Sequence, residues 1–269
     1  MRLIATDLDG TIVRADGSVS PRTAAAFAAA REAGVEVLLV TGRPTRWLVG
    51  LRPALGRLGT AICSNGAVVF DDDAQRVIEA TVLDVGLLVQ ARERVLQLAP
   101  DAVFAAETVQ GLHLEPGFLP SAEHREGVPE APFDAEALAA EGVVKLLARR
   151  TRGTCGEFDE LVRPELEQLV AVTHSAPGVP MIEMAALGVD KAVTLARHAE
   201  RLGINAADVV AFGDMPNDVG MLRWAGTGFA VGRDQPAVRA VADRVIGTVE
   251  EDSVALAVET LLGLETGLR

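Results

Sequence analysis

The sequence is short of cysteine, of long apolar runs and of positive charge. Its two cysteines, Cys63 and Cys155, are too few for a disulfide framework, and we expect both to be small buried residues in a reducing cytoplasm. No apolar run reaches the length of a membrane span, and no signal peptide is expected because a strand begins at the N-terminus. We therefore expect a cytoplasmic protein with no membrane partner.

The charge of the chain also limits its partners. Lysine and arginine number 25 against 38 aspartates and glutamates, which gives a formal net charge of −13. Because basic patches dominate affinity for nucleic acids, no nucleic-acid partner is expected. A phosphate ligand would have to be held by local positive groups. With 269 residues, of which 49% are hydrophobic, the chain can bury one large core or two modest ones.

A strand–helix rhythm marks both ends of the sequence. Apolar runs at residues 3–5, 35–40 and 61–63 are typical of buried strands, and helical patterns separate them. The rhythm returns with a helix at 191–202 and a strand at 209–212. Buried strands that alternate with helices indicate a parallel sheet with right-handed crossovers. We therefore predict an α/β fold whose sheet is built from both ends of the chain.

The middle of the sequence has another character. Residues 81–186 alternate helices with strands of half-exposed pattern. A hairpin around three adjacent aspartates at 71–73, which we expect to be solvated, precedes this region. We predict an α+β domain at residues 81–186, inserted into a first domain made of residues 1–80 and 187–269.

Two carboxylates follow the first strand at the edge where open α/β sheets bind ligands. Asp7 and Asp9 are one residue apart there, and a divalent cation is the usual means of offsetting such crowding. Mg²⁺ favours one or two carboxylates together with phosphate oxygens, and Asp214 lies in a second acidic loop. Asp7 could attack phosphorus, and Asp9 could protonate the leaving oxygen. The pattern indicates a metal-assisted site for a phosphorylated ligand.

Other strand and helix ends supply groups suited to a phosphate. Thr41 offers a hydroxyl and Gly42 a backbone N–H after the second strand. Lys191 begins a helix, so its ammonium group and the helix N-terminus can both face an anion.

With these residues in place, the chain resembles the haloacid dehalogenase superfamily of phosphohydrolases, in its Cof-type branch (subfamily IIB). The family carries four short motifs in a fixed order, and the resemblance covers essentially the whole chain. The matching segments are Asp7-Leu8-Asp9-Gly10-Thr11, Thr41-Gly42-Arg43, Lys191 in Gly188-Val189-Asp190-Lys191, and Gly213-Asp214-Met215-Pro216-Asn217-Asp218. The resemblance implies a Rossmann-like core domain with an inserted α+β cap domain of the C2 type.

The resemblance also implies a role for each matching residue. Asp7 is expected to be the nucleophile, through an aspartyl-phosphate, and Asp9 the general acid and base. Magnesium is expected to bind the Asp7 carboxylate, the Asp9 backbone carbonyl and Asp214, with Asp218 supporting it through water. The residues expected to hold the phosphate are Thr41, Gly42, Lys191, Asn65 and Asn217.

The predicted cap should decide the substrate. Strand alternation singles out Lys145, His113, His174 and Glu183 as candidate contacts of the leaving group, although exposed polar sheet positions would show the same pattern. We predict a Mg²⁺-dependent phosphatase of small phosphorylated metabolites, with sugar phosphates preferred over a phosphorylated cofactor, as a monomer or homodimer. The alternatives are a phosphotransferase or phosphomutase of the same superfamily and a non-catalytic metabolite-binding regulator.

Several residues near the motifs have an ordinary structural interpretation. We expect Asp190 to cap the helix that begins at Lys191, and Arg43 to form a salt bridge that fixes its loop. His198 is expected at the surface, and Met215 and Met221 in the core.

Overall fold

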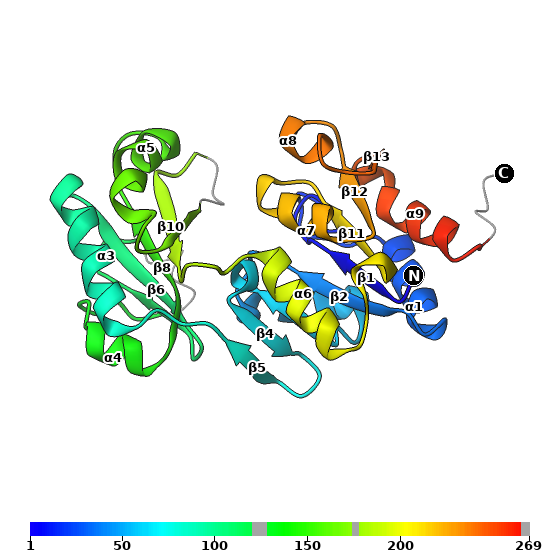
Figure 1. Ribbon diagram of the computed structural model, residues 1–269. Coiled ribbons are helices and arrows are strands. Elements are labelled where there is room, and N and C mark those ends of the chain that lie inside the picture. Colours follow the sequence, from blue (N-terminus) through cyan, green and yellow to red (C-terminus); the bar gives the residue numbers. More distant parts are fainter. Residues whose placement is uncertain (120–127, 174–177, 265–269) are drawn as a thin grey trace. The chain divides into compact units, whose positions relative to one another are not determined.

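Figure 1 shows the computed structural model of the chain, which describes residues 1–119, 128–173 and 178–264. The chain divides into two compact units, Met1–Ile78 with Asp190–Arg269, and Glu79–Val189. We refer to them as the first and the second unit. The assignment of residues 1–80 and 187–269 as a catalytic domain and of 81–186 as a cap stays a prediction.

The first unit is built on a sheet of eight strands in the order β13-β12-β11-β1-β2-β3-β4-β5. The strands from β13 to β3 are parallel to their neighbours, and β4 runs antiparallel to β3. The predicted α/β class with a largely parallel core sheet is confirmed. The strands are β1 (Leu3–Thr6), β2 (Glu36–Val40), β3 (Thr60–Cys63), β4 (Val68–Asp71), β5 (Arg76–Ala80), β11 (Val209–Gly213), β12 (Thr227–Val231) and β13 (Arg244–Ile246).

The helices of the first unit bury apolar side chains on this sheet. Leu195 of α6 and Met221 of α7 belong to the same buried cluster as Leu3 of β1. On α1, Arg22 donates hydrogen bonds of 2.9 and 2.6 Å to the carboxylate of Glu259 on α9. The helices are α1 (Pro21–Glu32), α2 (Arg52–Leu55), α6 (Lys191–Arg201), α7 (Val219–Trp224), α8 (Pro236–Arg239) and α9 (Ser253–Leu261), with 3₁₀ turns η1 (Thr45–Leu51), η2 (Ser64–Gly66), η4 (Ala206–Asp208), η5 (Pro216–Asp218) and η6 (Val249–Glu251).

The start of α6 is fixed by two local interactions. As predicted, Asp190 caps the helix, and its carboxylate accepts a 2.7 Å hydrogen bond from the backbone N–H of Val193. The hydroxyl of Thr194 donates to the carbonyl of Gly66 at 2.8 Å. A Cβ on Gly66 would lie 2.3 Å from the carbonyl oxygen of Asp190, so only glycine allows this close approach. Lys191 is therefore held at a defined position beside the turn that follows β3.

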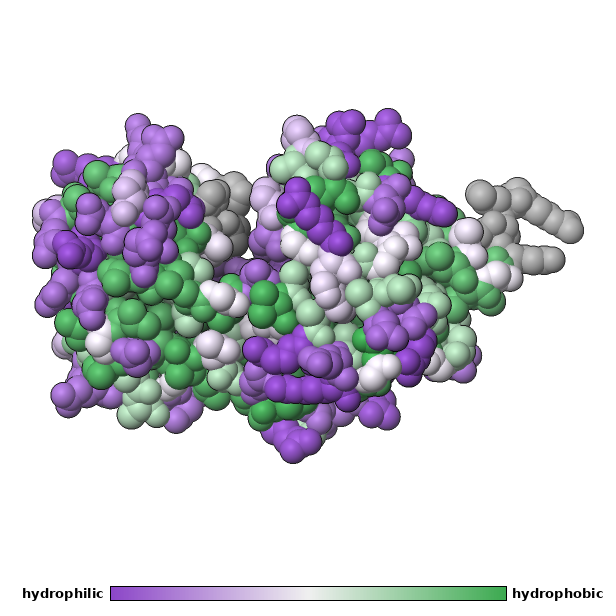
Figure 2. Space-filling model, in the orientation of Figure 1, coloured by the Kyte–Doolittle hydropathy of each residue, from purple (hydrophilic) through white to green (hydrophobic). Residues whose placement is uncertain are grey.

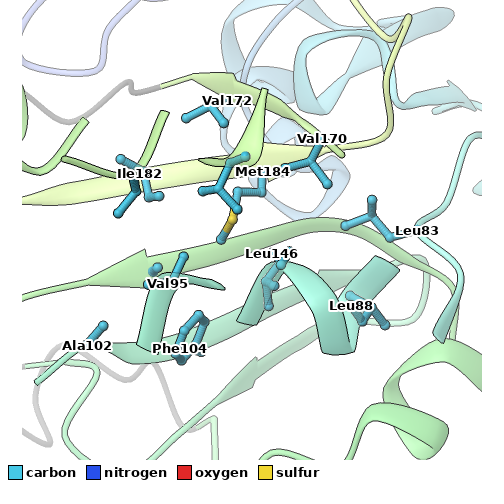
Figure 3. Packing of buried hydrophobic residues seen from close by; sticks show 14 of the residues in the cluster. Leu83, Leu88, Val95, Ala102, Phe104, Leu146, Val170, Val172, Ile182 and Met184 are labelled. Atoms are coloured by element: carbon cyan, nitrogen blue, oxygen red, sulfur yellow. The ribbon is translucent and has the colours of Figure 1, made fainter. Parts of the chain in front are cut away.

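The second unit contains an antiparallel sheet of five strands in the order β7-β6-β8-β10-β9. One face of this sheet is covered by helices, and Figure 3 shows Phe104, Leu146 and Met184 packed with Leu88 and Val95 of α3. The elements are α3 (Val85–Leu98), β6 (Val103–Thr108), β7 (Leu112–Leu114), α4 (Ala135–Ala140), β8 (Val143–Arg149), α5 (Cys155–Leu166), β9 (Ala171–Thr173) and β10 (Met181–Ala185).

Hydrophobic side chains also reach the molecular surface. In Figure 2 they gather over α3 and toward the end of α9. Exposed residues of these helices include Val85, Val89 and Leu261. None of the helices in the described ranges is both long and apolar enough to cross a membrane.

Two expectations for charged residues are wrong. The acidic turn is not solvated throughout, because Asp72 is buried and accepts two hydrogen bonds of 2.9 Å from Arg52. His198 is buried rather than exposed. It follows Leu195 by three residues and Lys191 by seven, so it lies on the same buried stripe of α6.

Of the four cysteine and methionine residues that were expected to be buried, two are buried and two are not. Met221 and Cys63 are buried, as expected. Met215 is exposed because it lies in the loop after β11, and Cys155 is half-buried at the start of α5, where its thiol donates to the carbonyl of Met181 at 3.3 Å.

Candidate active site

The candidate site is formed by the loops at the carboxyl ends of parallel strands in the first unit. Asp7 directly follows β1, Thr41 follows β2 and Asp214 follows β11. Because β1 pairs in parallel with both β2 and β11, these three loops leave the sheet at one edge. The sheet thus brings together residues that are more than 200 positions apart in the sequence.

A buried lysine links two of the acidic loops. The Nζ atom of Lys191 lies 2.5 Å from Oδ1 of Asp7 and 2.7 Å from Oδ1 of Asp218. All three side chains are buried. Burial alone would lower the pKa of Lys191, but the carboxylates of Asp218 and Asp7 outweigh it and raise that pKa above its ordinary value. The lysine is therefore a fixed positive charge at this edge of the sheet.

Three carboxyl groups lie close together beside this lysine. One ligand atom from each of Asp7, Asp214 and Asp218 falls within 4.8 Å of the others. Asp214 accepts a 2.6 Å hydrogen bond from the hydroxyl of Thr11, and Oδ2 of Asp218 accepts from the backbone N–H groups of Asp214 and Met215 at 3.1 and 3.0 Å. These bonds orient the carboxylates toward one another.

The crowding of these acids changes their proton affinity. Burial raises the pKa of Asp7 to about 8, against the opposing effect of Lys191, and Asp218 adds to the rise. Burial likewise raises the pKa of Asp214 to about 6, although the hydrogen bond from Thr11 opposes the shift. The single positive charge of Lys191 therefore does not neutralise all three carboxylates. A bound cation would neutralise the remaining negative charge.

The donor set fits magnesium. Carboxylate oxygens are hard ligands of the kind that Mg²⁺ and Mn²⁺ prefer, and the described residues around this cluster add no thiolate or imidazole to it. Gly10 leaves room for the cluster, since a Cβ at this position would lie 2.4 Å from Oδ2 of Asp214. The expected magnesium site comprises the Asp7 carboxylate, the Asp9 backbone carbonyl and Asp214, with Asp218 supporting it through water. The cluster of the three carboxylates is compatible with this expectation.

Asp9 lies apart from this cluster and is paired with Arg43. The guanidinium group of Arg43 binds both carboxylate oxygens of Asp9, with Nε 2.8 Å from Oδ2. The Asp9 side chain is 61% exposed. The backbone N–H of Arg43 donates to the hydroxyl oxygen of Thr41 at 3.0 Å, so one loop positions both residues. The salt bridge expected of Arg43 is present, and its partner is the predicted general acid.

The remaining phosphate-binding candidates surround the turn after β3. Nδ2 of Asn217 donates to Oδ1 of Asn65 at 3.0 Å, which joins the loops after β3 and β11. Asn65 has a left-handed backbone with φ of 57°, and its side chain lies against the backbone of Gly42. The structure thus gathers Thr41, Gly42, Asn65, Asn217 and Lys191 around the same loops.

Three of the four candidates in the predicted cap lie in the described residues, and the structure brings two of them together. Nζ of Lys145 on β8 lies 2.8 Å from Oε2 of Glu183 on β10, and both side chains are buried. His113 is opposite Ala106 in register, on the helix-covered face of the sheet, and its Nε2 lies 2.6 Å from Glu141. His174 lies outside the described residues.

Two contacts of the site have only weak signals in the sequence. Thr11 orients Asp214, and Asp218 shares Lys191 with Asp7. The threonine belongs to the first motif, but nothing in the sequence indicates its partner 203 residues away.

Comparisons with known proteins show the family of the chain. Residues 4–258 match the family of haloacid dehalogenase-like hydrolases. A 5-amino-6-(5-phospho-D-ribitylamino)uracil phosphatase from Bacillus subtilis is 30% identical over 263 residues, 96% of this chain and 94% of its own length. A pyridoxal phosphate phosphatase from Escherichia coli is 30% identical over 271 residues, 94% of this chain and 96% of its own length.

Solved structures show the same fold. A phosphatase of this superfamily from Bacteroides thetaiotaomicron superposes with a TM-score of 0.83 at 23% identity, covering 98% of this chain and 95% of its own. A subclass IIB sugar phosphatase superposes with a TM-score of 0.78 at 22% identity, covering 97% of this chain and 99% of its own. The recognition made from the four motifs is confirmed, and the chain belongs to the haloacid dehalogenase-like hydrolases of the Cof type.

Proposed function

We propose that this hydrolase is a Mg²⁺-dependent phosphatase that cleaves small phosphorylated metabolites through a phosphorylated Asp7. The observation that carries the proposal is the buried contact of Lys191 with both Asp7 and Asp218, beside the carboxylate of Asp214. The phosphatase activities named for the two curated relatives support it, since each relative covers nearly the whole chain.

In this proposal Asp7 and Asp9 divide the chemistry between them. A carboxylate oxygen of Asp7 attacks phosphorus, the ester P–O bond breaks, and the leaving oxygen takes a proton from Asp9. Water then attacks the phosphorylated Asp7 and gives a proton to Asp9, which releases phosphate and restores both carboxyl groups. Arg43 holds Asp9 before the reaction, and Asp9 must leave this pair to reach the leaving oxygen.

The other residues bind and neutralise the phosphoryl group. Lys191 supplies a buried positive charge, while the hydroxyl of Thr41 and the backbone N–H of Gly42 are hydrogen-bond donors at the same loop. Asp7, Asp214, Asp218 and the backbone carbonyl of Asp9 would hold the magnesium ion. When bound, this ion offsets the charge on the phosphoryl oxygens.

We further propose that the second unit supplies substrate specificity. Lys145 and Glu183 are its candidate leaving-group contacts, because they are charged residues on the sheet face opposite the helices. His113 is the weaker candidate, since it lies on the other face. The leaving group is proposed to be a sugar, as predicted from the sequence, or a phosphorylated cofactor.

A phosphotransferase or phosphomutase would use the same first step. In that case an alcohol rather than water would accept the phosphoryl group, and analysis of the products distinguishes the two. A non-catalytic regulator is disfavoured, since a binding protein has no need of an acid at Asp9.

The experiment that tests the function is phosphate release from a panel of phosphorylated metabolites, with Mg²⁺ and with a chelator. We expect release by the wild type with Mg²⁺ only, and none by Asp7→Asn. Asp72→Asn is a matched control, since Asp72 is also a buried aspartate of the first unit but pairs with Arg52. Equal turnover by Asp7→Asn and wild type would contradict the assignment of the nucleophile.

A further inference from the structure

A polar cavity lies at the amino ends of β2 and β3 in the first unit. It has a volume of about 350 Å³, and its lining includes the charged residues Arg31, Glu36, Arg57 and Asp73. Glu36 begins β2, whereas Thr41 follows the other end of this strand, five residues or about 17 Å further on. Because β2 and β3 are parallel, their amino ends lie at the edge of the sheet opposite the candidate active site. The cavity is therefore separate from that site.

The guanidinium group of Arg31 lacks an acceptor in this cavity. Its Nη2 atom is buried, and none of the described residues accepts a hydrogen bond from it. Burial lowers the pKa of Arg31, although the carboxylates of Glu36 and Asp73 oppose the shift. A buried donor without an acceptor is costly, and more so when it is charged. The protein thus leaves part of the charge of Arg31 uncompensated.

Two other arginines of the first unit show the usual arrangement. Arg22 donates to both carboxylate oxygens of Glu259, and Arg52 donates to both of Asp72. These hydrogen bonds raise the pKa of each arginine, whereas that of Arg31 is lowered. What Arg31 lacks is therefore a group with two acceptor oxygens.

Arg57 adds a second guanidinium group to the lining. Its Nε and Nη2 atoms donate at 2.9 and 2.5 Å to the same oxygen of Asp73, and its side chain is 85% exposed. This one-sided pairing leaves further N–H groups of Arg57 available to a ligand. The opposing charge in the lining is Glu36, which is exposed at the start of β2. In a chain of net charge −13, two arginines that share a cavity form a local positive site.

We propose that this cavity binds a small oxyanion, the carboxylate or phosphate group of a metabolite, between Arg31 and Arg57. A guanidinium group presents parallel N–H bonds that match two oxygens of such a group. A volume of about 350 Å³ lies near the lower end of the range for ligand pockets, about 300–1,000 Å³, which suits a small molecule. Binding here is independent of the phosphatase function, since none of the catalytic candidates lines the cavity.

NMR detection of the arginine Nε–H groups tests this site. We would titrate the isotope-labelled protein with sodium acetate and with sodium phosphate, in the presence of a chelator and at constant ionic strength. The signals of Arg31 and Arg57 are assigned from their absence in Arg31→Met and Arg57→Met. Both signals should shift and saturate in the millimolar range. Acetate and phosphate distinguish the two sources of the oxyanion, because the probe that binds more tightly identifies the group that the site accepts.

Three variants show which charges matter. Arg31→Met should weaken binding about tenfold, measured on the signal of Arg57, because charge-assisted hydrogen bonds are lost. Glu36→Gln should strengthen binding about threefold, because it removes the opposing carboxylate of the lining. Arg76→Met is the matched control. Arg76 is 71% exposed and pairs with Asp71 outside the lining, so its replacement removes the same charge and should leave Kd unchanged.

Other outcomes would overturn the inference. Shifts that stay linear with concentration, or that sodium chloride reproduces, would show an adventitious ion only. Equal losses of affinity in Arg76→Met and Arg31→Met would show that overall charge explains the binding. Weaker binding in Glu36→Gln would show that the cavity favours a cation.

A further variant separates this cavity from the candidate active site. Lys191→Met removes the buried charge of that site and should leave the shifts of Arg31 and Arg57 unchanged. If the wild type releases no phosphate from any ester but these shifts saturate, the phosphatase proposal fails and the oxyanion site stands. If Lys191→Met abolishes the shifts, the anion binds at the catalytic edge of the sheet and the inference fails.

Discussion

Each unit of the molecule buries one lysine among carboxylates, but only one of the two lysines lies within a sheet. Lys191 lies at the start of a helix, beside loops at strand ends, and contacts Asp7 and Asp218. Lys145 lies within β8, with Glu107 opposite it in register and Glu183 at 2.8 Å. Backbone N–H groups inside a sheet are committed to neighbouring strands, whereas those of Asp214 and Met215 bind the Asp218 carboxylate. Strand ends can therefore collect more carboxylates than one lysine neutralises, which is what a metal site requires.

The strongest test of this comparison exchanges each lysine for methionine. Lys191→Met should lower kcat for phosphate release by about 10²- to 10³-fold, because a buried charge aimed at the phosphoryl group is lost. Lys145→Met should change kcat by much less, since the proposed catalytic residues Asp7 and Asp9 lie in the first unit. Steady-state kinetics with acetyl phosphate, whose leaving group is small, measures both. Similar losses in kcat for the two variants would show that Lys191 and Lys145 do not differ in their contribution to catalysis.

The second test concerns stability within the second unit. Removing one partner of a buried ion pair typically costs about 3–5 kcal/mol, whereas replacing both by apolar residues is often neutral. Local opening of β8 and β10 should therefore be far more frequent in Lys145→Met than in the double variant Lys145→Met/Glu183→Met. Hydrogen exchange of the amides in these strands measures this difference. Equal destabilisation by the single and the double variant would show that the Lys145–Glu183 ion pair does not determine the stability of β8 and β10.

The third test measures how stability depends on pH, because the first unit holds more buried carboxyl groups than Lys191 neutralises. Without metal, the native protein keeps protons on Asp7, with a pKa of about 8, and on Asp214, with a pKa of about 6, whereas the unfolded carboxyls release them near 3.8. The free energy of unfolding should thus fall as pH rises from about 4 to about 8. Because Mg²⁺ binds the ionised carboxylates, the increase in Tm that it causes should be larger at pH 8 than at pH 5.5.

Thermal melts with Mg²⁺ and with a chelator across this range measure the effect. Asp214→Asn is the control and should flatten the part of the profile below about pH 6. A rise in Tm with Mg²⁺ that is independent of pH would contradict the link between metal and protons.

The smallest expected effect comes from two glycines with the same backbone conformation. Gly10 and Gly17 have φ of +83° and +82°, so an alanine at either position costs about 1 kcal/mol of strain. A Cβ at Gly10 would also collide with Asp214, whereas nothing lies within 4 Å of one at Gly17. Gly10→Ala should weaken apparent Mg²⁺ affinity about tenfold, and Gly17→Ala should not. Kinetic titration with Mg²⁺ gives both values, and equal affinities would show that Gly10 does not shape the metal site.

The sequence was informative where a local rule determines structure. The parallel core sheet, the cap on α6 and the buried position of Met221 all follow from apolar runs and helix-start residues. The burial of His198 and Asp72 does not follow from a local rule, because it depends on tertiary packing. The first lies on the buried stripe of α6, and the second finds Arg52 twenty residues earlier in the chain.

The candidate site was predictable as a set of residues but not as a set of contacts. Motif order identified Asp7, Lys191 and Asp214, because each ends a strand or begins a helix. The sequence does not show which side chains form pairs. The hydrogen bonds from Thr11 to Asp214 and from Arg43 to Asp9 depend on how neighbouring loops approach one another. In the second unit, alternation along strands gave polar positions, but only the register showed that His113 and Lys145 lie on opposite faces.

The contact between Gly66 and the start of α6 has a consequence for protein engineering. Gly66 precedes the second unit in the chain and Asp190 follows it, yet the two meet inside the first unit and are joined by the hydrogen bond from Thr194. The position of Lys191 is thus set by residues that do not belong to the insertion. Grafting the insertion of a relative between them should therefore yield chimaeras that keep Lys191 beside Asp7 and, if the second unit sets specificity as proposed, differ in the substrates they accept.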